Sequence, residues 1–416
     1  MFFNVKTSTE VFKILEKFEP LGDEMLPLEQ TLGRVLSRDI IAQEDLPGFS
    51  RATMDGYAVR ARDTFGATES LPALLDVTGE VIMGQIPAMP VGPGQAVRIS
   101  TGGMLPENAD GVAMVEYCHS LDENTIEVSY TISHLENVIQ PGDDLRKGTV
   151  ILKKGAILRP QDLGVIAGLG QPELRVYKRP KVAIISTGDE VIPIEQNPAP
   201  GQIRDINRYS LSALCRQAGA EPISIGLCPD NFEQLRSMVE QGLRAADTVW
   251  ISGGSSVGTR DLTLKVFESF DNMELLVHGI SVRPGKPTII ARINSTLIVG
   301  LPGHVASAMI VAQIFLAPFI ARLSGWKDIS VQLYNHVKAE LSRGIESASG
   351  RDDYIRIKLD KKEEKLIANP IFGKAGLIST LVEADGLIKI DRNTEGLYQG
   401  EDVEVILFNP VKGEFH

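Results

Sequence analysis

Cysteine is scarce in this chain of 416 residues, which has only three cysteines and six histidines. Cys118, Cys215 and Cys228 lie far apart, form no CxxC pair and have no histidines at zinc-ligand spacing. A disulfide framework and a structural zinc site are therefore not expected. The isolated thiols predict free, buried cysteines in a protein of a reducing compartment, which we take to be the cytoplasm.

Basic residues are in the minority, because 42 Lys and Arg face 54 Asp and Glu and give a formal net charge of -12. Such a surface repels a polyanion, so nucleic acid is not expected as a partner. Local clusters of cations could still bind a small anion. A chain of this length with 43% hydrophobic residues is too large for one compact core, and two to four domains are expected.

Long hydrophobic runs are rare, and the N-terminus lacks the basic start and apolar core of a signal peptide. Thr7 and Glu10 instead have the spacing of a capping box, which predicts an N-terminal helix. One run, residues 305–326, is long enough to approach the thickness of a membrane. A proline and two polar side chains interrupt it, so we expect a helix buried in a core or at a subunit contact, and no membrane partner.

Between about residues 180 and 326, short apolar runs alternate with amphipathic stretches. This alternation predicts a doubly wound α/β domain, in which helices flank a parallel sheet. The expected strands cover residues 181–186, 222–227, 248–252 and 296–300. Asp230 and Glu233 are expected to cap the helix that follows the second strand.

The remaining sequence indicates three further parts of a multidomain chain. Residues 46–145 are rich in Gly and Pro, which predicts an inserted β-rich arm. Residues 327–416 alternate apolar and polar side chains, which predicts a small C-terminal β-barrel. Residues 1–45 and 146–179 then form a connecting domain that includes the N-terminal helix. A charged turn at 360–365 is expected at the tip of a solvated hairpin.

Three expected strand ends of the α/β domain carry one kind of loop, in which glycines lie beside polar side chains. Ligands bind at the carboxyl ends of the strands in open parallel sheets. The candidate residues are, in chain order, Thr187, Gly188 and Glu190, then Gly253, Gly254, Ser255 and Asp261, then Pro302, Gly303 and His304.

Glycine lets the backbone approach an anionic oxygen closely, and hydroxyl groups add hydrogen-bond donors. Asp261 and Glu190 would repel a phosphate unless a divalent cation lay between them, which suggests Mg²⁺. Taken singly, each loop is better explained as a tight turn, with Asp261 capping the next helix. Three such loops at one sheet edge favour a phosphate-containing ligand.

The segment RPGKP places Arg283 and Lys286 on either side of a Pro-Gly turn. By itself it is an exposed hairpin with solvated charges. Because it precedes the strand that leads to His304, the two cations could supply the positive end of an oxyanion site. No Ser-His-Asp or Cys-His arrangement is readable, so a catalytic triad is not expected.

Seven motifs follow one another along most of the chain, from about residue 5 to 410. They are TMDGYAV, RISTGG, ISTGDEVI, GQIRDINRYSL, SGGSSVG with a following aspartate, RPGKP and GLPGH. Each motif alone is weak, but the ordered set is specific. Together they resemble the molybdopterin molybdenumtransferase family, the MoeA-like proteins that include the E domain of gephyrin.

This resemblance implies an enzyme of molybdenum cofactor biosynthesis that inserts molybdate, or tungstate, into adenylated molybdopterin, releases AMP and depends on Mg²⁺. It also implies a homodimer with an active site shared between subunits. The α/β domain would be similar to the molybdopterin adenylyltransferase fold. That adenylyltransferase and the proteins that receive the finished cofactor are the expected partners.

The resemblance assigns roles to individual positions. Asp261 and Glu190 match the Mg²⁺ and phosphate site. The other implied catalytic residues are Asp55, Thr101, Asp230 and Lys286. The positions expected around molybdate are Lys286, Pro287, Ser307 and Arg351, with Arg356 as a second choice. A tetrahedral dianion suits such a set, because cations and hydroxyl donors bind it and carboxylates do not.

The chain departs from the family pattern at three places. The family usually has KPGKP and PGNP, so Arg283 replaces a lysine and His304 an asparagine. Arginine keeps the charge but changes its geometry, and a histidine could tune the pH dependence or the choice of oxyanion. Around Ala375 a serine-rich stretch of the family is missing.

Two alternatives stay open at this point. One is a molybdopterin adenylyltransferase, which would share the α/β domain, although the arm and the barrel argue against it. The other is a catalytically impaired cofactor-binding or scaffold protein, suggested by the departures at His304 and Ala375. The retained Asp261, Glu190 and Lys286 argue against a scaffold.

Overall fold

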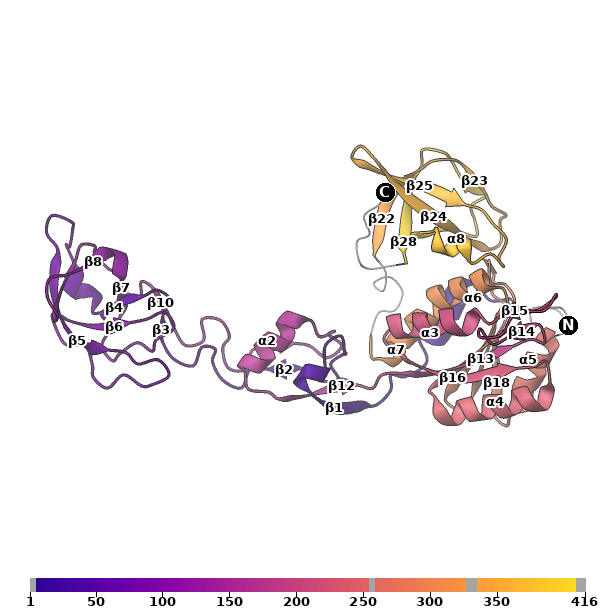
Figure 1. Ribbon diagram of the computed structural model, residues 1–416, viewed down its shortest axis with the longest axis horizontal. Helices are drawn as coiled ribbons and strands as arrows, with labels where there is room; N and C mark the ends of the chain where they lie inside the picture. The colour runs from indigo at the N-terminus through magenta and orange to yellow at the C-terminus, as the bar shows by residue number, and fades with distance from the viewer. Residues whose placement is uncertain (1–4, 254–258, 327–334, 409–416) are drawn as a thin grey trace.

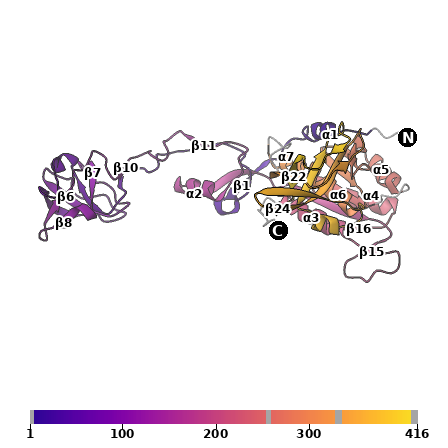
Figure 2. The same cartoon turned by 90° about the horizontal axis from the view of Figure 1, so that it is seen from above.

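The structure, a computed structural model, describes residues 5–253, 259–326 and 335–408, with the side chains of residues 259–261 also outside the description. The molecule is elongated (Figure 1). A β-rich arm forms one end, a small connecting region follows, and the α/β part with a β-barrel beside it forms the other end. The view from above shows the same order (Figure 2).

The arm is a six-stranded sheet with the order β7-β4-β6-β5-β9-β8. Its strands are β4 (Gly56–Val59), β5 (Ala73–Glu80), β6 (Gln95–Ile99), β7 (Gly111–Met114), β8 (Cys118–Ser120) and β9 (Thr125–Val128). Two apolar clusters, one containing Val97 and one containing Leu75, form its core. A short antiparallel pair, β3 (Arg51–Ala52) with β10 (Val138–Ile139), lies where the chain enters and leaves the arm.

The connecting region is built from two antiparallel pairs and one helix. β1 (Asp23–Pro27) pairs with β12 (Glu173–Tyr177), and β2 (Ile40–Ile41) pairs with β11 (Val150–Leu152). α2 (Pro160–Gly168) covers them, with Ile166 fully buried. The outgoing and returning segments of the chain are thereby held side by side.

The predicted N-terminal helix is present as α1 (Ser8–Leu15) and carries the predicted capping box. The Glu10 amide donates to Thr7 Oγ1 at 3.2 Å, and the Thr7 amide donates to Glu10 Oε2 at 2.8 Å. The helix does not pack in the connecting region, where the sequence placed it. Its apolar face joins the α/β core, with the rings of Phe12 and Phe315 5.2 Å apart.

The α/β part has a six-stranded sheet with the order β16-β13-β17-β21-β20-β18. The four predicted strands are present as β13 (Lys181–Thr187), β16 (Glu221–Cys228), β17 (Thr248–Gly253) and β21 (Thr296–Leu301), all mutually parallel. Two further strands extend the sheet: β20 (Ile289–Ile293) pairs antiparallel with β21, and β18 (Met273–His278) pairs antiparallel with β20. The predicted doubly wound α/β class is confirmed.

Helices cover both faces of this sheet, so alternate residues of β13 are buried on opposite sides. Val182 and Ile184 pack with α3 (Asn207–Gln217), whereas Ala183 and Ile185 pack with α4 (Phe232–Ala245) and α5 (Thr259–Glu268). α3 connects β13 to its neighbour β16 on one side, and α4 connects β16 to β17, the neighbour of β13 on the other side. The carboxyl ends of β13 and β17 therefore lie at the topological switch point of the sheet.

The apolar run after residue 304 forms a continuous helical rod made of α6 (Val305–Val311), a π-helical turn η4 (Ala312–Leu316) and α7 (Ala317–Leu323). Among the described residues it is the one stretch long and apolar enough to cross a membrane, and 89% of its most apolar window is buried inside the protein. It packs against α3 and α1, as expected of a core helix.

The last part of the chain forms the predicted β-barrel. Its strands are β22 (His336–Leu341), β24 (Asp352–Lys362), β25 (Lys365–Ile371), β26 (Gly386–Ile390) and β28 (Asp402–Leu407), closed by the pairing of β24 with β26. The turn between Lys362 and Lys365 is the predicted charged hairpin tip. Shorter elements are β23 (Ile345–Glu346), β27 (Gly396–Leu397) and α8 (Ser379–Val382).

The barrel is joined to the α/β part through a shared strand. β19 (Val282–Arg283), which lies between β18 and β20 in the chain, pairs in parallel with β24 of the barrel and places Arg283 opposite Asp353. The amide of Ala306 at the start of α6 donates to the Ala375 carbonyl at 3.0 Å. These contacts fix the position of the barrel over the N-terminal end of α6.

All three cysteines are free. Cys215 and Cys228 are buried as predicted, and burial raises the pKa of the Cys228 thiol to about 11. Cys118, on the arm, is only half-buried. Thiolate chemistry at neutral pH is therefore not favoured at Cys228.

Candidate functional site

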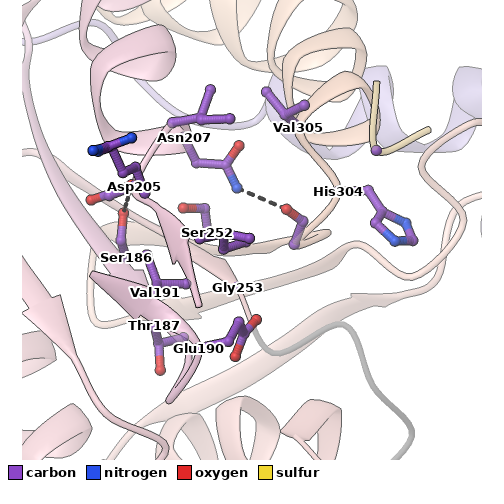
Figure 3. Close-up of a pocket in the computed structure, with 15 residues that line it drawn as sticks. Ser186, Thr187, Glu190, Val191, Asp205, Asn207, Ser252, Gly253, His304 and Val305 are labelled. Atoms are coloured by element: carbon purple, nitrogen blue, oxygen red, sulfur yellow. Dashed lines mark hydrogen bonds between the residues drawn. The ribbon is translucent and has the colours of Figure 1, made fainter. Parts of the chain in front are cut away.

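A polar cavity of about 290 Å³ lies at the carboxyl ends of β13 and β17 (Figure 3). It is closed on one side by β14 (Val191–Ile192) and β15 (Ile203–Arg204), and on the other by the start of α6. The lining residues that carry polar side chains are Ser186, Thr187, Glu190, Arg204, Asp205, Asn207, Ser252 and His304. We call this space the sheet-end cavity.

The structure explains why glycine occupies two of the predicted loop positions at this edge of the sheet. Gly253 ends β17 with φ of 134°, and a Cβ atom there would lie 1.8 Å from the Thr187 carbonyl oxygen of β13. Gly188 has φ of 145°, and a Cβ there would lie 2.9 Å from Glu190 Oε2. Only glycine fits both positions, because L side chains rarely adopt these φ values.

Two buried polar atoms in this region, Asn207 Oδ1 and Ser252 Oγ, have no partner among the described residues. A third, Asp205 Oδ2, accepts no hydrogen bond there but lies 3.4 Å from Arg208 Nε in an ion pair. Asp205 is 3% exposed, and its other oxygen accepts a bond from Ser186 Oγ at 3.0 Å. Asn207 Nδ2 donates to the Gly303 carbonyl at 2.9 Å (Figure 3). Buried polar atoms without partners are rare, so these acceptors indicate a ligand that supplies hydrogen-bond donors.

These three residues and Ser186 were not among the candidates from the sequence. Asp205 and Asn207 belong to the motif GQIRDINRYSL, which carried the resemblance but no assigned role. The sequence did contain a signal for the two serines. Ser186 and Ser252 each stand one position before a candidate, Thr187 and Gly253, at the end of an expected strand. What the sequence could not show is the burial that makes them informative.

Asp230 lies beside the sheet-end cavity. Thr187 Oγ1 donates to Asp230 Oδ1 at 3.0 Å, which brings two predicted residues together. Asn231 caps α4 through Gln234, so the prediction that Asp230 and Glu233 form that cap is wrong. The Asp230 carboxylate is thereby left for Thr187. Burial, together with the charges of Asp189 and Glu190, raises the pKa of Asp230 although the Thr187 bond opposes the shift.

Asp230→Asn is expected to stabilise the fold at pH 7.5 by a few tenths of a kcal/mol, a value reduced by partial exposure of the site. The raised pKa means that the charged form is disfavoured in the folded state, and the amide removes that penalty while still accepting from Thr187. The gain should shrink as the pH falls through the folded pKa. Urea unfolding at pH 7.5 and pH 4 measures it, and a gain that grows on acidification contradicts the sign.

The metal site predicted at Glu190 and Asp261 is only half visible. Glu190 lines the sheet-end cavity, whereas Gly254, Ser255 and the side chain of Asp261 lie outside the described residues. Within the ranges described, no three His, Cys, Asp or Glu side chains are grouped to enclose a metal ion. Mg²⁺ needs no such cage, because it commonly keeps several waters and binds one or two carboxylates together with substrate phosphates.

A second cavity, of about 510 Å³, lies between the α/β part and the barrel. It brings together five candidates from the sequence: Arg283, Lys286, Pro287, Ser307 and Arg351. Ser281 and Ser349 add hydroxyl groups, and no carboxylate is among the described residues that line it. Its charge is therefore positive inside a protein of net charge -12, and we call it the basic cavity.

Arg356, the second choice for a cation, does not line the basic cavity. It lies in the barrel, where its guanidinium donates to Thr380 Oγ1 and to the Gly373 carbonyl. Burial lowers its pKa. A third, smaller cavity of about 310 Å³ contains Arg356 and shares Arg283 with the basic cavity.

The remaining candidates are divided between the two ends of the molecule. Gly303 and His304 line the sheet-end cavity, and Pro302 is buried behind them. Asp55 and Thr101 meet on the arm, where the Thr101 amide and hydroxyl donate to Asp55 Oδ1 at 2.7 and 2.9 Å and hold the pKa of that carboxyl low. Within one chain the arm lies far from both cavities (Figure 1).

Three family models match the chain, and each match covers a part of the fold described above. Residues 183–322, which form the α/β part, match the family model described as a probable molybdopterin binding domain. Residues 6–170 match the MoeA N-terminal region (domain I and II), and residues 338–408 match the MoeA C-terminal region (domain IV).

Whole-chain relatives agree with these matches. A molybdopterin molybdenumtransferase of Haemophilus influenzae is 32% identical over 96% of this chain and 98% of its own, and one of Bacillus subtilis is 30% identical over 95% and 92%. The crystal structure of a molybdopterin biosynthesis MoeA protein from Pyrococcus horikoshii has a TM-score of 0.85 at 35% identity, covering 98% of this chain and 100% of that one. The chain belongs to the MoeA family, and so to the transferases of molybdenum cofactor biosynthesis.

Proposed function

We propose that this protein inserts molybdate, or tungstate, into adenylated molybdopterin, with release of AMP and dependence on Mg²⁺. One observation carries the proposal. Two cavities of opposite chemistry lie at the start of the same helix, α6: His304 lines the acceptor-rich sheet-end cavity and Ser307 the basic cavity. A substrate with an organic part and an oxyanion to be joined to it needs both.

The basic cavity suits a tetrahedral oxyanion. Arg283, Lys286 and Arg351 supply positive charge, and the Ser307 hydroxyl group supplies a donor. Hydrogen bonds between such cations and an oxyanion are short and strong. The absence of a carboxylate from its described lining removes the main source of repulsion.

The sheet-end cavity suits the organic part. A pterin presents ring and exocyclic N-H donors along one edge. Asn207 Oδ1 and Ser252 Oγ are acceptors without a partner, and Asp205 Oδ2 accepts no hydrogen bond within the described residues. Buried oxygens that accept no hydrogen bond are unfavourable in the empty protein. Binding a donor-rich heterocycle would satisfy them, which gives both affinity and orientation.

The Mg²⁺ ion would be held by Glu190, which lines the sheet-end cavity, and by Asp261 on the sequence assignment. Its chemistry when bound would be to neutralise charge on the phosphoanhydride. The like-charged neighbours Asp189, Glu190 and Asp230 fit this role. Burial, and then the charges of Asp189 and Glu190, raise the pKa of Asp230, and a cation nearby would offset that repulsion.

The chain's own residues would act mainly by positioning. Lys286, Arg283 and Arg351 would hold molybdate so that one of its oxygens, or a water, faces the phosphoanhydride. The attacking oxygen would form a new bond to phosphorus as the anhydride phosphorus–oxygen bond breaks, which releases AMP. The two dithiolene sulfurs would bind molybdenum as one molybdate oxygen leaves with the two thiol protons as water. No covalent enzyme intermediate is needed, since orientation and charge neutralisation supply the acceleration.

The decisive test is AMP release from adenylated molybdopterin by the purified protein with Mg²⁺, with molybdate and tungstate titrated in parallel. Glu190→Gln is the variant, because it keeps the side chain's size and removes its charge. Oxyanion-dependent release that is lost in the variant supports the proposal. AMP bound or released without dependence on either oxyanion points to a cofactor-binding or scaffold protein, and adenylation of molybdopterin by ATP points to an adenylyltransferase.

We propose further that the protein works as a homodimer in which the arm of one subunit reaches the cavities of the other. The pair of Asp55 and Thr101 supports this, because two hydrogen bonds fix an exposed carboxylate on the arm, far from the cavities of its own chain (Figure 1). We place the reaction in the cytoplasm, with the adenylyltransferase as donor of substrate and cofactor-dependent enzymes as recipients.

Mixing two inactive variants should therefore restore activity. Asp55→Asn and Lys286→Ala subunits, unfolded and refolded together, would form heterodimers with one intact site. Random assortment predicts about one quarter of wild-type activity. If both residues act within one chain, the mixture stays as inactive as either variant alone. Size-exclusion chromatography before and after mixing checks that dimers form.

A further inference from the structure

Asp353 is a buried carboxylate between the α/β part and the barrel. It lies on β24 and is 0% exposed. Its Oδ1 accepts from Arg351 Nε at 2.9 Å, and its Oδ2 accepts from Ser347 Oγ at 2.9 Å and lies 3.5 Å from Arg283 Nη1. A buried charge is tolerated when it is paired and hydrogen-bonded, and this one has both kinds of partner.

The two arginines that Asp353 contacts belong to different parts of the molecule. Arg283 comes from β19 in the α/β part, and Arg351 precedes β24 of the barrel. Their side chains are 52% and 35% exposed, and both line the basic cavity. Asp353 contacts no more than part of each guanidinium. In the described part of the chain no other hydrogen bond to either guanidinium is present, so their remaining N-H groups are available to a ligand.

We infer that Asp353 is the positioning residue of the basic cavity, which holds Arg283 and Arg351 so that a tetrahedral oxyanion meets two fixed guanidinium groups. This inference rests on the proposed function, because it assigns the oxyanion to that cavity. An arginine fixed before binding loses less conformational entropy on meeting its ligand than a free one. The pairing of β19 with β24, with Arg283 opposite Asp353, fixes the backbone that carries the contact.

The same arrangement sets the charge of the cavity. Arg283, Lys286 and Arg351 are three cations of the described lining, and Asp353 is the carboxylate that pairs with two of them. The remaining double positive charge is the complement of a dianion such as molybdate or tungstate. Positioning and charge make opposite predictions for removal of the carboxylate, which is what makes the role testable.

The experiment compares wild type with Asp353→Asn by calorimetric titration with sodium molybdate and sodium tungstate. If Asp353 positions the arginines, the Kd for either oxyanion rises about tenfold or more, although the cavity gains positive charge. If the carboxylate only subtracts charge, binding becomes tighter, and that result overturns the inference. An unchanged Kd overturns it as well.

The matched control is Asp360→Asn, which makes the same chemical change further along β24, where the partner is Asn369 at 2.8 Å and no cavity residue is involved. It should leave the Kd unchanged. In turnover assays Asp353→Asn should raise the KM for molybdate and leave the KM for adenylated molybdopterin within about twofold. A loosened barrel would instead lower the thermal midpoint and disturb both KM values.

A second variant covers the case in which Asp353→Asn does not fold. Arg351→Lys keeps the charge but cannot reproduce the geometry of a guanidinium held through Nε. It should weaken oxyanion binding about fivefold or more, and unchanged affinity would overturn the inference. If wild type binds neither oxyanion, both the proposed function and the positioning role of Asp353 are wrong. If wild type binds and both variants equal it, only the positioning role fails.

Discussion

Lys286→Ala is expected to lower kcat/KM for molybdate by about 100-fold or more. Lys286 is one of three cations in a cavity whose described lining has no carboxylate. Its backbone carbonyl accepts from the Ile280 amide, a contact that alanine retains. The substitution therefore removes a charge from the cavity and leaves the turn that carries it.

The measurement is AMP release at varied molybdate, with Lys358→Ala as the control. Lys358 lies on β24 with its side chain in solvent, so the control removes an equal charge outside the cavity. Added ethylamine at millimolar concentration should restore part of the Lys286→Ala activity, because it can supply an ammonium group to the space left behind. A variant with wild-type kcat/KM for molybdate would remove the basic cavity from the proposed site.

The parts of the fold that could be predicted from the sequence depend on local patterns. Strands buried on both faces read as continuous apolar runs, which is why β13 and β17 were found within one or two residues. The capping box of Thr7 and Glu10 and the charged turn between β24 and β25 are equally local. Each pattern contains within a few residues all the information that its structure requires.

The parts that were missed depend on contacts between distant segments. β19 is two residues long, and only its pairing with β24 makes it a strand. The cap of α4 is Asn231, whereas Asp230 accepts a hydrogen bond from Thr187, some forty positions away in the chain. The position of α1 is a further example. Its apolar face packs on the α/β core through contacts with residues far along the chain, which the local pattern of the helix does not contain.

The candidate site shows the same division. Motifs located Thr187, Glu190, Gly253, Gly303 and His304 at one cavity, because loops at parallel strand ends converge. They did not locate Asp205, Asn207 or Ser252, whose significance lies in buried oxygens that accept no hydrogen bond within the described residues. Asp353 was missed because a carboxylate in a strand looks like any other until its two arginines are seen.

Gly253→Ala is expected to destabilise the protein by about 3 kcal/mol or more, the largest effect on stability among the substitutions considered. Gly253 pairs with Thr187 at the end of β17, and a Cβ atom would lie 1.8 Å from the Thr187 carbonyl oxygen. The φ of 134° adds strain for any L side chain. Relief requires β17 to separate from β13 at the edge where the sheet-end cavity lies.

Urea unfolding of Gly253→Ala, followed by the fluorescence of the buried Trp250 on the same strand, measures this loss. The control is Gly164→Ala in α2, where an added Cβ meets nothing within 4 Å and helix propensity predicts a small gain, on the order of 0.5 to 1 kcal/mol. Activity separates two causes. If the end of β17 shifts while the protein stays folded, AMP release falls even under conditions in which the variant is fully folded. Gly253 and Thr187 both line the cavity, so the shift would distort it. If both the free energy of unfolding and the activity of Gly253→Ala equal those of wild type, the prediction that position 253 must be glycine is wrong.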